Sequence, residues 1–540
     1  MKRDRLTRTE VDFEAPTVAT LLFSIFMRFV IAAFVLQCVC CTPCLKKFYW
    51  RESFVCVCNS TYCDDVEALG DVALERAVVY STDMKQDRLT RTEVNFEEPT
   101  EKYVKVTVDL SKKRQKIIGF GGCINDNIIP ASTQPLQDKL IDQYFGKNGI
   151  EYSASRVPIG ANDASVEEWT YLDTPEDYEL KTFTMEKDLK IPILQKIVKV
   201  NPKIKLFAAA WSVPAWMKET GKLADAGKIK GKLNGYFYVL YAKYLIKFIE
   251  EYRNRSLNFW GITVMNEPGD QARDWPGTFM NFVEQRDFVK HRLGPMMKHT
   301  WFTKDIKIIA YDWHRDRLYE AAKEIYQDKD TYIDGLGVHW YAPENWDKLD
   351  LTHNLRPDKF IWATEATIDD FGHEYGHWYN AEKYADDIIK NLRRHVAGWI
   401  EWSLWTNLHG GPSYMGNFVG SSVIVNSTSQ EFYKQPQFYA LGHFSKFLTA
   451  DSIVLDSTFE GFMDPDPPLE GVAAETPEGN VALVVMNRHR KNAYNLGISD
   501  GRTDGKIIKI VMKPNTIKTI VWKKPKEWKS FQHQKCLCMQ

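Results

Sequence analysis

Two runs of sequence, GITVMNEP at residues 261–268 and KFIWATEAT at residues 359–367, decide how this chain folds. Each run is apolar over the length of one strand and then reaches a carboxylate, Glu267 in the first and Glu365 in the second. Continuous apolar runs of this length are typical of strands that are buried on both faces, as in a parallel sheet covered by helices. The glutamate that closes each run therefore marks the end of its strand.

Six further runs of the same kind lie between residues 116 and 405. They are KIIGFGG (116–122), SASRVPIG (153–160), IKLFAAAW (204–211), IKIIAYD (306–312), GLGVHWY (335–341) and VAGWIEWSLW (396–405). Amphipathic stretches at residues 135–145 and 235–252 predict helices between the strands. Eight strands alternating with helices predict an α/β fold, a (β/α)8 TIM barrel built from residues 112–402 and 437–449. A doubly wound open sheet is the alternative, but no Gly-x-Gly-x-x-Gly turn follows the first run.

Both ends of the chain predict β structure outside the barrel. Residues 104–110 and 481–522 alternate apolar and polar positions, and the second segment contains Asp-Gly turn signals. We expect an accompanying antiparallel all-β sandwich from residues 68–111 and 450–524. Residues 525–540 are predicted to be a polar, lysine-rich tail.

The composition is that of an ordinary globular protein, and its overall charge does not favour a strongly charged partner. Of 540 residues, 44% are apolar and 26% are charged, and the formal net charge is −1. The chain therefore has no global field that would attract nucleic acid or a membrane. Its 17 tryptophans are compatible with sugar binding, in which aromatic faces pack on pyranose rings, although large cores also contain tryptophan.

The N-terminus predicts export. The apolar run at residues 18–39 is interpreted as a signal peptide that starts at Met27 and is cleaved near residue 40. Residues 1–17 are nearly repeated at residues 84–100, with three differences, which is not the fixed period of a structural repeat. We therefore interpret residues 1–43 as a duplicated leader and signal peptide. A cytosolic tail ahead of a membrane anchor is the alternative.

Four cysteines follow the predicted cleavage point within twenty residues: Cys44, Cys56, Cys58 and Cys63. In an exported chain such a cluster predicts two disulfides, here in a small antiparallel β region expected from residues 44–67 and 403–436. Zinc binding is the alternative, but the spacing of Cys56 and Cys58 is wrong for a zinc knuckle. Three Asn-x-Ser/Thr sequons are candidates for glycosylation, at Asn59, Asn254 and Asn426.

Glu267 and Glu365 close strands about half a barrel apart, so both can reach one central cleft at the carboxyl ends of the strands. Two carboxyl groups about 5 Å apart perform retaining glycoside hydrolysis, in which one attacks the anomeric carbon and the other protonates the leaving oxygen. Charge repulsion across such a gap raises the pKa of one member, which equips that member as the acid. One strand-end glutamate is usually solvated or salt-bridged, but two at matching positions favour catalysis. Asn266, beside the acid, is a candidate ligand for the sugar 2-hydroxyl.

Several motifs, in this order, carry a resemblance to a known family. They are CVCNSTYC (56–63), FGGCIND (120–126), SRVPIGANDAS (155–165), AAAWSVPAWMK (208–218), VMNEP (264–268), VHWY (338–341), ATEA (363–366), GWIEWSL (398–404), GNFVGSSVIV (416–425) and FYKQPQFYALGHFSKF (432–447). Together they resemble the glucosylceramidases, or acid β-glucosidases, of glycoside hydrolase family 30. The resemblance covers nearly everything from Cys44 to about Lys524.

The resemblance implies roles for individual residues. Glu267 would be the acid/base and Glu365 the nucleophile. Arg156 matches a residue near the nucleophile, although a purely structural ion pair is the alternative, and His339 is as much an ordinary buried histidine as part of the site wall. The residues that match substrate-binding positions are Asp163, Trp211, Asn266, Tyr341, Trp402 and Asn417.

The function implied by the resemblance is hydrolysis of glucosylceramide to glucose and ceramide by double displacement, with no cofactor and no metal. The implied location is the lysosome, reached through the secretory pathway and peripheral to its membrane, with secretion as the alternative. The implied partners are a glycosphingolipid substrate, a saposin-type activator and an anionic lipid surface. The lysines of residues 218–232 are a candidate for that lipid contact, although such runs are more often solvated faces.

Other functions remain open at this stage. A related glycosidase could act on a sterol glucoside, xylan or β-1,6-glucan, because the loops that bind the leaving group vary most. A catalytically dead binding protein would lack one carboxylate, and both are present. A metal-dependent hydrolase is a third alternative. The loop at residues 269–279 is shorter than expected and presents Trp275, and Thr367 stands where the family would have cysteine.

Overall fold

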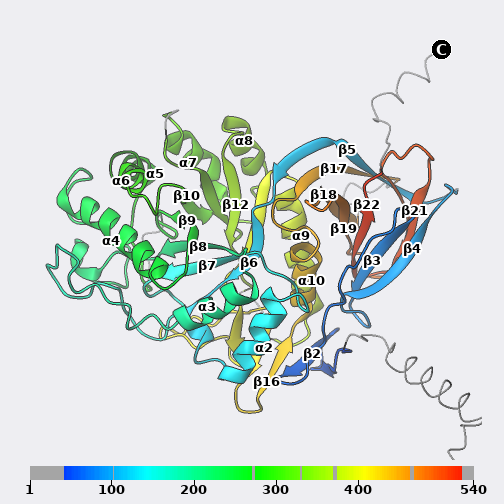
Figure 1. The fold of residues 1–540 in the computed structure, drawn as a ribbon, viewed down its shortest axis with the longest axis horizontal. Helices are drawn as coiled ribbons and strands as arrows, with labels where there is room; N and C mark the ends of the chain where they lie inside the picture. The colour runs from blue at the N-terminus through cyan, green and yellow to red at the C-terminus, as the bar shows by residue number, and fades with distance from the viewer. Residues whose placement is uncertain are drawn as a thin grey trace, which may run out of the picture. The chain divides into compact units, whose positions relative to one another are not determined.

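The barrel predicted from the eight apolar runs is present in the computed structural model of the chain (Figure 1). The structure describes residues 42–100, 102–269, 274–328, 331–368, 374–461 and 468–525. The barrel closes in the order β10-β11-β12-β13-β6-β7-β8-β9, with parallel neighbours throughout. Its strands are β6 (Gly119–Cys123), β7 (Ala154–Ile159), β8 (Lys205–Ala210), β9 (Phe259–Thr263), β10 (Lys307–His314), β11 (Gly335–His339), β12 (Phe360–Glu365) and β13 (Val396–Glu401). Each predicted run contributes one strand, which confirms the TIM barrel and excludes the open sheet.

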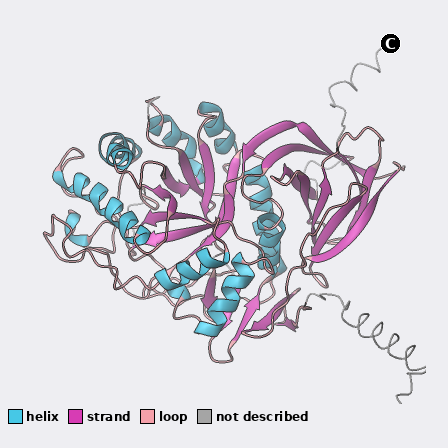
Figure 2. Cartoon of the chain, in the orientation of Figure 1, coloured by secondary structure: helices cyan, strands magenta, loops and turns pink. Residues whose placement is uncertain are grey.

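Helices surround the barrel strands (Figure 2). The amphipathic stretches at residues 135–145 and 235–252 form α2 (Gln134–Phe145) and α4 (Tyr236–Arg253), as predicted. Proline near the first turn of α2, α3, α6 and α10 suits a position whose N–H has no helical acceptor. The remaining helical segments are η1 (Asp126–Ile128), α3 (Ile191–Val200), η2 (Ala215–Met217), α5 (Phe282–Phe288), η3 (Val289–Leu293), α6 (Gly294–His299), η4 (Arg315–Arg317), α7 (Leu318–Ile325), α8 (Asp347–Leu355), α9 (Trp378–Leu392) and α10 (Pro436–Ser445).

The β-sandwich combines strands from both ends of the described chain. Its hydrogen-bonded ladder runs β17-β18-β19-β22-β3-β4-β21-β20-β5 and closes on itself, because the long strand β5 pairs with both β17 and β20. The pairing of β20 with β5 is parallel, so the expectation of a wholly antiparallel sandwich is wrong at that pair. The strands are β3 (Arg76–Asp83), β4 (Thr90–Glu97), β5 (Val104–Lys116), β17 (Ile453–Glu460), β18 (Leu469–Glu475), β19 (Asn480–Asn487), β20 (Tyr494–Ser499), β21 (Ile507–Met512) and β22 (Thr516–Lys523).

A smaller sheet has five strands in the order β1-β2-β16-β15-β14. The strands are β1 (Lys46–Phe48), β2 (Phe54–Asn59), β14 (Trp405–Asn407), β15 (Val423–Asn426) and β16 (Glu431–Lys434). The sheet was expected to be antiparallel, but β14 pairs with β15 in parallel because a long loop, not a hairpin, joins them. Since β14 begins three residues after Trp402, the sheet continues directly from the end of the last barrel strand.

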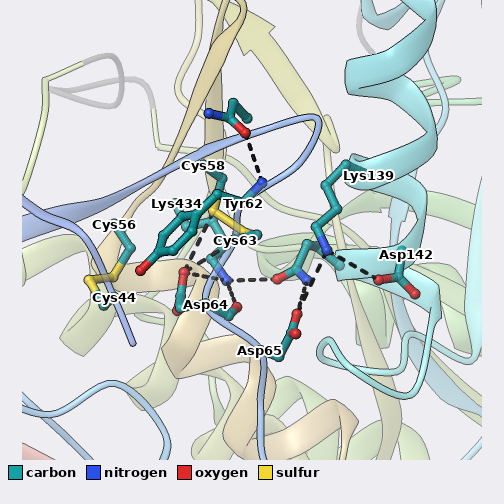
Figure 3. The surroundings of a disulfide bond; sticks show 12 residues. Cys44, Cys56, Cys58, Tyr62, Cys63, Asp64, Asp65, Lys139, Asp142 and Lys434 are labelled. Carbon is teal, nitrogen blue, oxygen red and sulfur yellow. Dashed lines mark hydrogen bonds and ion pairs between the residues drawn. A yellow bond between two sulfur atoms is a disulfide. The ribbon is translucent and has the colours of Figure 1, made fainter. Parts of the chain in front are cut away.

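The small sheet contains the two predicted disulfides, which join Cys44 to Cys56 and Cys58 to Cys63 (Figure 3). Beside them, the buried ammonium group of Lys434 on β16 lies 2.9 Å from Oδ1 of Asp64 and donates to its backbone oxygen. The four cysteines therefore form two disulfides, and the alternative of zinc binding is excluded for them.

The barrel and the sandwich share a hydrogen-bonded junction. Gln115 on β5 donates to the backbone oxygens of Leu392 and Val396, at 2.8 and 2.9 Å. The buried ring of His443 on α10 lies between two sandwich hydroxyls, those of Thr519 and Thr82. The boundary predicted after residue 111 falls inside β5, which runs on to Lys116 before the barrel starts.

Within the described ranges, none of the helices combines the length and the apolar character needed to cross a bilayer. The predicted signal peptide and the predicted C-terminal tail lie almost wholly outside the described residues. Those two predictions therefore stay predictions.

Candidate active site

A pocket of about 320 Å³ lies at the carboxyl ends of the barrel strands. Its walls come from residues at or just after the ends of seven of the eight strands, the usual site of catalysis in this fold. All eight residues predicted to act on or bind the sugar line it. The lining residues are Asp163, Trp211, Asn266, Glu267, Trp275, His314, Tyr341, Glu365, Thr367, Trp402, Asn417 and Val419.

Glu365, the last residue of β12, accepts hydrogen bonds from two side chains. Arg156 on β7 donates to Oε2, and the Tyr341 hydroxyl donates to Oε1 at 3.1 Å. Arg156 is fully buried; burial disfavours its charge, but Asp312 and Glu365 outweigh burial and raise its pKa further above the usual range. A permanent cation and a phenol therefore both donate to the Glu365 carboxylate and hold it in place.

Glu267 lies across the pocket from Glu365, and both glutamates lie close to the same histidine, His339. Nδ1 of His339 is 2.9 Å from Oε1 of Glu267 and 3.7 Å from Oε1 of Glu365. The two glutamate oxygens are therefore no farther apart than the sum of these distances. The two oxygens could be about 6.5 Å apart, the smallest separation found in inverting glycosidases, only if they lay on nearly opposite sides of Nδ1. The geometry therefore favours the shorter spacing of about 5 Å found in retaining glycosidases.

Asp312, near the end of β10, holds the cations of the site in place. Its carboxylate accepts from Nη2 of Arg156 at 2.8 Å and from the Thr364 hydroxyl at 2.6 Å, and it lies 3.2 Å from Nε2 of His339. Burial opposes ionisation of this carboxyl, but Arg156 and His339 outweigh burial and lower its pKa. Asp312 was not predicted as a site residue. It closes the run IKIIAYD, so the rule that found the two glutamates would also have found it.

The pocket also contains groups that hold protons at neutral pH. Burial lowers the pKa of His339, but the charges of Glu365, Asp312 and Glu267 outweigh burial and raise that pKa to about 9. Burial, together with Glu365 and Glu267, raises the pKa of Asp163 to about 7. The His339 ring thus lies between the two glutamates and Asp312, which goes beyond both roles considered for it from the sequence.

The remaining pocket residues form an aromatic and amide wall. The rings of Trp211 and Trp402 lie 5.2 Å apart and 37° from parallel, and the Arg156 guanidinium lies 4.6 Å from the Trp211 centroid. The amide of Asn417 donates to Oδ2 of Asp163 at 2.7 Å. Arg156 donates to Oδ1 of Asn266 at 2.6 Å, so the NH2 group of Asn266 is the one left to meet a substrate hydroxyl. This wall offers apolar ring faces beside hydroxyl-binding groups, as a sugar requires.

Three backbone positions in the site have positive φ angles: Glu267 at 43°, Tyr311 at 71° and Asp312 at 48°. Such conformations cost side-chain-bearing residues about 1–3 kcal/mol each and concentrate at functional sites. The pairing of β10 with β11 shifts register between Tyr311 and Trp313. The irregular backbone places Asp312 between Arg156 and His339.

The last barrel strand ends on a second buried glutamate, Glu401, which the sequence analysis did not single out. Its carboxyl accepts from the backbone N–H and the hydroxyl of Ser422, at 2.7 and 2.8 Å, and the Tyr152 hydroxyl lies 3.4 Å away. Burial raises the pKa of Glu401 to about 8, although the hydrogen bonds from Ser422 and Tyr152 oppose that rise. Glu401 therefore carries a proton at neutral pH, next to Trp402 but outside the pocket lining.

A metal site was not expected because no His-x-x-x-His spacing was found, but that was wrong: HEYGH at residues 373–377 has this spacing, and it is also the His-Glu-x-x-His spacing of zinc hydrolases. That motif binds zinc only on a helix. Here α9 begins at Trp378, Glu374 pairs with Arg51, and Nδ1 of His377 lies 2.9 Å from Glu52. In the pocket, His339 has both ring nitrogens within 3.2 Å of carboxylate oxygens, so metal binding there would have to break those contacts.

The lysine-rich loop is only partly available to a membrane. Lys218 is fully buried, where its ammonium group pairs with Asp225 and donates to the backbone oxygens of Leu223 and Gly277. The interpretation of residues 218–232 as a solvated or lipid-binding run is wrong for this residue, because Lys218 fastens the loop internally.

The other predicted features lie at the surface or at the pocket edge. Asn254 is exposed at the end of α4, and the side-chain oxygens of Asn59 and Asn426 accept from backbone N–H groups of their own turns. Trp275 and Thr367 line the pocket, and the Thr367 hydroxyl donates to the Gly420 oxygen at 2.9 Å. Residues 270–273 of the shortened loop lie outside the described residues.

A (β/α)8 barrel whose strand ends bring two glutamates to one histidine defines a class of protein, the barrel enzymes that cleave glycosidic bonds. Residues 117–448 match the glycosyl hydrolase family 30 TIM-barrel domain, and residues 460–520 match the family 30 β-sandwich domain. The chain belongs to glycoside hydrolase family 30 and is a glycosidase.

Several relatives resemble this chain over most of their length. A Caenorhabditis elegans protein named putative glucosylceramidase 3 is 39% identical over 88% of this chain and 93% of its own. Mouse lysosomal acid glucosylceramidase is 34% identical over 89% of this chain and 96% of its own. The solved structure of an endo-β1,6-glucanase is similar with a TM-score of 0.73 and 25% identity, covering 83% of this chain and all of that one.

Proposed function

We propose that this chain is a retaining β-glucosidase that hydrolyses glucosylceramide to glucose and ceramide, with Glu365 as nucleophile and Glu267 as acid/base. The observation that supports the mechanism is the pair of fixed donors at Glu365. Arg156 and Tyr341 both donate to Glu365, and His339 lies 2.9 Å from Glu267 on the other side of the pocket. The group with two fixed donors suits the nucleophile, which must be ionised before the reaction begins.

In the first step, the Glu365 carboxylate attacks the anomeric carbon while Glu267 gives its proton to the glycosidic oxygen. The carbon–oxygen bond to ceramide breaks, and ceramide leaves as an alcohol. In the second step, Glu267, now ionised, takes a proton from water as that water attacks the anomeric carbon. The bond to Glu365 breaks, glucose leaves with retained configuration, and both carboxyl groups return to their starting states.

The substrate proposal is supported by the relatives named glucosylceramidase and by the size of the pocket. A volume of about 320 Å³ is near the lower end of the range for small-molecule sites, about 300–1,000 Å³, and suits one sugar ring. The lipid part of the substrate would then lie outside the pocket. The name of the mouse relative supports a lysosomal or secretory compartment for the activity. A membrane surface and a saposin-type activator are further parts of the proposal.

The second candidate is hydrolysis of another β-glycoside, above all a β-1,6-glucan. The specific observation in its favour is the similarity to a solved endo-β1,6-glucanase. A chain-cleaving enzyme needs space for sugars on both sides of the scissile bond. Xylan and sterol glucoside are further candidates, of which the experiment below tests xylan.

The test compares glucosylceramide with β-1,6-glucan and xylan oligomers at pH 5, using the secreted protein. We expect turnover of glucosylceramide, and faster cleavage of either oligomer would overturn the substrate proposal. On soluble aryl β-glucosides, Glu365→Gln should remove turnover for every leaving group. Glu267→Gln should lose about 10²–10⁴-fold with poor leaving groups and far less with good ones. Equal and mild losses for both variants would contradict the assigned roles.

A further inference from the structure

The most exposed large apolar side chain of the described residues is Trp50, which follows β1 at the edge of the small sheet. Trp50 is 102% exposed relative to a free side chain, and Phe48 and Leu45 are 59% and 56% exposed. Single exposed apolar residues are ordinary, but three within six positions form a patch that burial would stabilise. We call Leu45, Lys46, Lys47, Phe48 and Trp50 the β1 surface.

The β1 surface is held in one shape before anything binds it. The Cys44–Cys56 disulfide joins it to β2 (Figure 3). The backbone oxygen of Leu45 accepts from the backbone N–H of Val57 at 2.9 Å. Trp50 itself has a φ of 61°, a conformation that is unfavourable for a side chain of its size. A chain that keeps a strained, fully exposed tryptophan on a cross-linked turn points to a role for that side chain at the surface.

The charge of the β1 surface is positive. Lys46 and Lys47 are exposed. Lys46 lies over Phe54 at 4.6 Å, Lys47 lies over Tyr49 and Tyr433 at 5.1 and 5.2 Å, and the charge of Glu431 also acts on Lys47. A cation over a ring keeps its charge available to an anion on its open side. Exposed aromatic residues beside lysines match the interface of a bilayer that contains anionic lipid.

The β1 surface is tied to the end of the barrel that holds the catalytic pocket. Tyr49, next to Trp50, stacks on Tyr375 at 4.4 Å, and Arg51 pairs with Glu374. Tyr375 and Glu374 belong to the connection that follows β12, the strand that ends on Glu365. The β1 surface therefore lies on the same side of the barrel as the catalytic pocket.

We propose that the β1 surface docks the protein on an anionic lipid bilayer. Trp50, Phe48 and Leu45 enter the interface, Lys46 and Lys47 meet the headgroups, and a glycolipid in the same bilayer is brought to the pocket. The substrate part of this inference rests on the proposed function, whereas the docking part does not. A lysine near an anionic surface contributes about 1 kcal/mol, so the two lysines together account for about a 30-fold difference in affinity.

The test is binding of the secreted protein to glycolipid-free vesicles at pH 5, measured by flotation. The vesicles are phosphatidylcholine alone or with phosphatidylserine. The variants are Phe48→Ala/Trp50→Ala and Lys46→Gln/Lys47→Gln. Trp301→Ala is the matched control, because Trp301 is also exposed, at 67%, but lies after α6 and packs against Arg253. Turnover of a soluble aryl β-glucoside reports folding and the intact pocket.

We expect the aromatic variant to bind anionic vesicles at least about tenfold more weakly, because it removes most of the apolar area that the interface covers. The lysine variant should lose about 30-fold on anionic vesicles, and the control should bind as the unchanged protein does. Soluble turnover should be the same in all four proteins. Equal binding by all four proteins, equal binding to neutral vesicles, or a dimer that Trp50 holds together would each overturn the docking proposal. Docking without glucosylceramide turnover would contradict only the proposed substrate.

Discussion

The pKa of Glu401 predicts a specific effect of pH on stability. Glu401 is fully buried at the end of β13, where Ser422 and Tyr152 surround its carboxyl group. The substitution Glu401→Gln keeps the shape of the side chain and the acceptor for the Ser422 N–H. Its NH2 group replaces Oε2 and donates, so the Ser422 hydroxyl turns to accept from it. The substitution therefore removes the titration and leaves the packing nearly unchanged.

The size of the effect follows from the raised pKa. Unfolded, Glu401 loses its proton near 4.5, whereas the folded chain holds that proton up to a pKa of about 8. The folded state binds more protons in this interval, so the stabilisation is complete below pH 4.5 and is lost as the pH rises through 8. Each pKa unit corresponds to about 1.4 kcal/mol, which makes the loss on the order of 5 kcal/mol by pH 8. The Gln variant has no such loss.

The assay is urea unfolding of both proteins at pH 5, 6, 7 and 8. At pH 5 their free energies of unfolding should agree to within about 1 kcal/mol, the usual effect of an isosteric change. By pH 8 the Gln variant should be the more stable by several kcal/mol. Parallel pH curves for the two proteins, or a Gln variant that is already much weaker at pH 5, would refute the assignment of a buried, protonated Glu401.

Two other changes have predictable outcomes. Asp312→Asn leaves the buried charges of Arg156 and His339 without their shared carboxylate, so the free energy of unfolding at pH 5 should fall by about 3–5 kcal/mol; a loss below about 1 kcal/mol in urea unfolding would contradict that role. Cys44→Ala/Cys56→Ala opens a loop of 12 residues and should cost about 3 kcal/mol relative to the oxidised protein. Differential scanning calorimetry checks this, and a melting temperature as high as that of the unchanged protein would count against it.

The barrel was predictable from the sequence because its strands are buried on both faces. Every position of β6, β7 and β13 is buried, so these strands appear in the sequence as mostly apolar runs. The runs are too short to be typical helices, which identifies them as strands. The sandwich was predicted only in part. The parallel pairing of β20 with β5 joins segments whose separation gives no local signal. The range predicted for the sandwich includes β3 and β4, but neither was predicted as an individual strand.

The candidate site was predicted in its lining but not in its electrostatics. Strand-end position and the family resemblance named most of the residues that line the pocket, but not His314 or Val419. The contacts of Asp312 depend on a register shift in β10, and the proton on Glu401 depends on complete burial. Neither property is a function of local sequence, because both arise when distant segments pack together.

The small sheet also has a consequence for how the chain is made. Lys434 and Asp64 are 370 residues apart, and β2 has its partner β16 only once that far end has been synthesised. At about 5–20 residues per second, the ribosome needs roughly 20–75 s to deliver it. During that wait β2 has an unpaired edge, which is prone to join other chains. The two disulfides join cysteines that are only 12 and 5 residues apart, so they can form long before β16 is synthesised. Oxidation would then fix the hairpin of β1 and β2 before β16 covers the edge of β2.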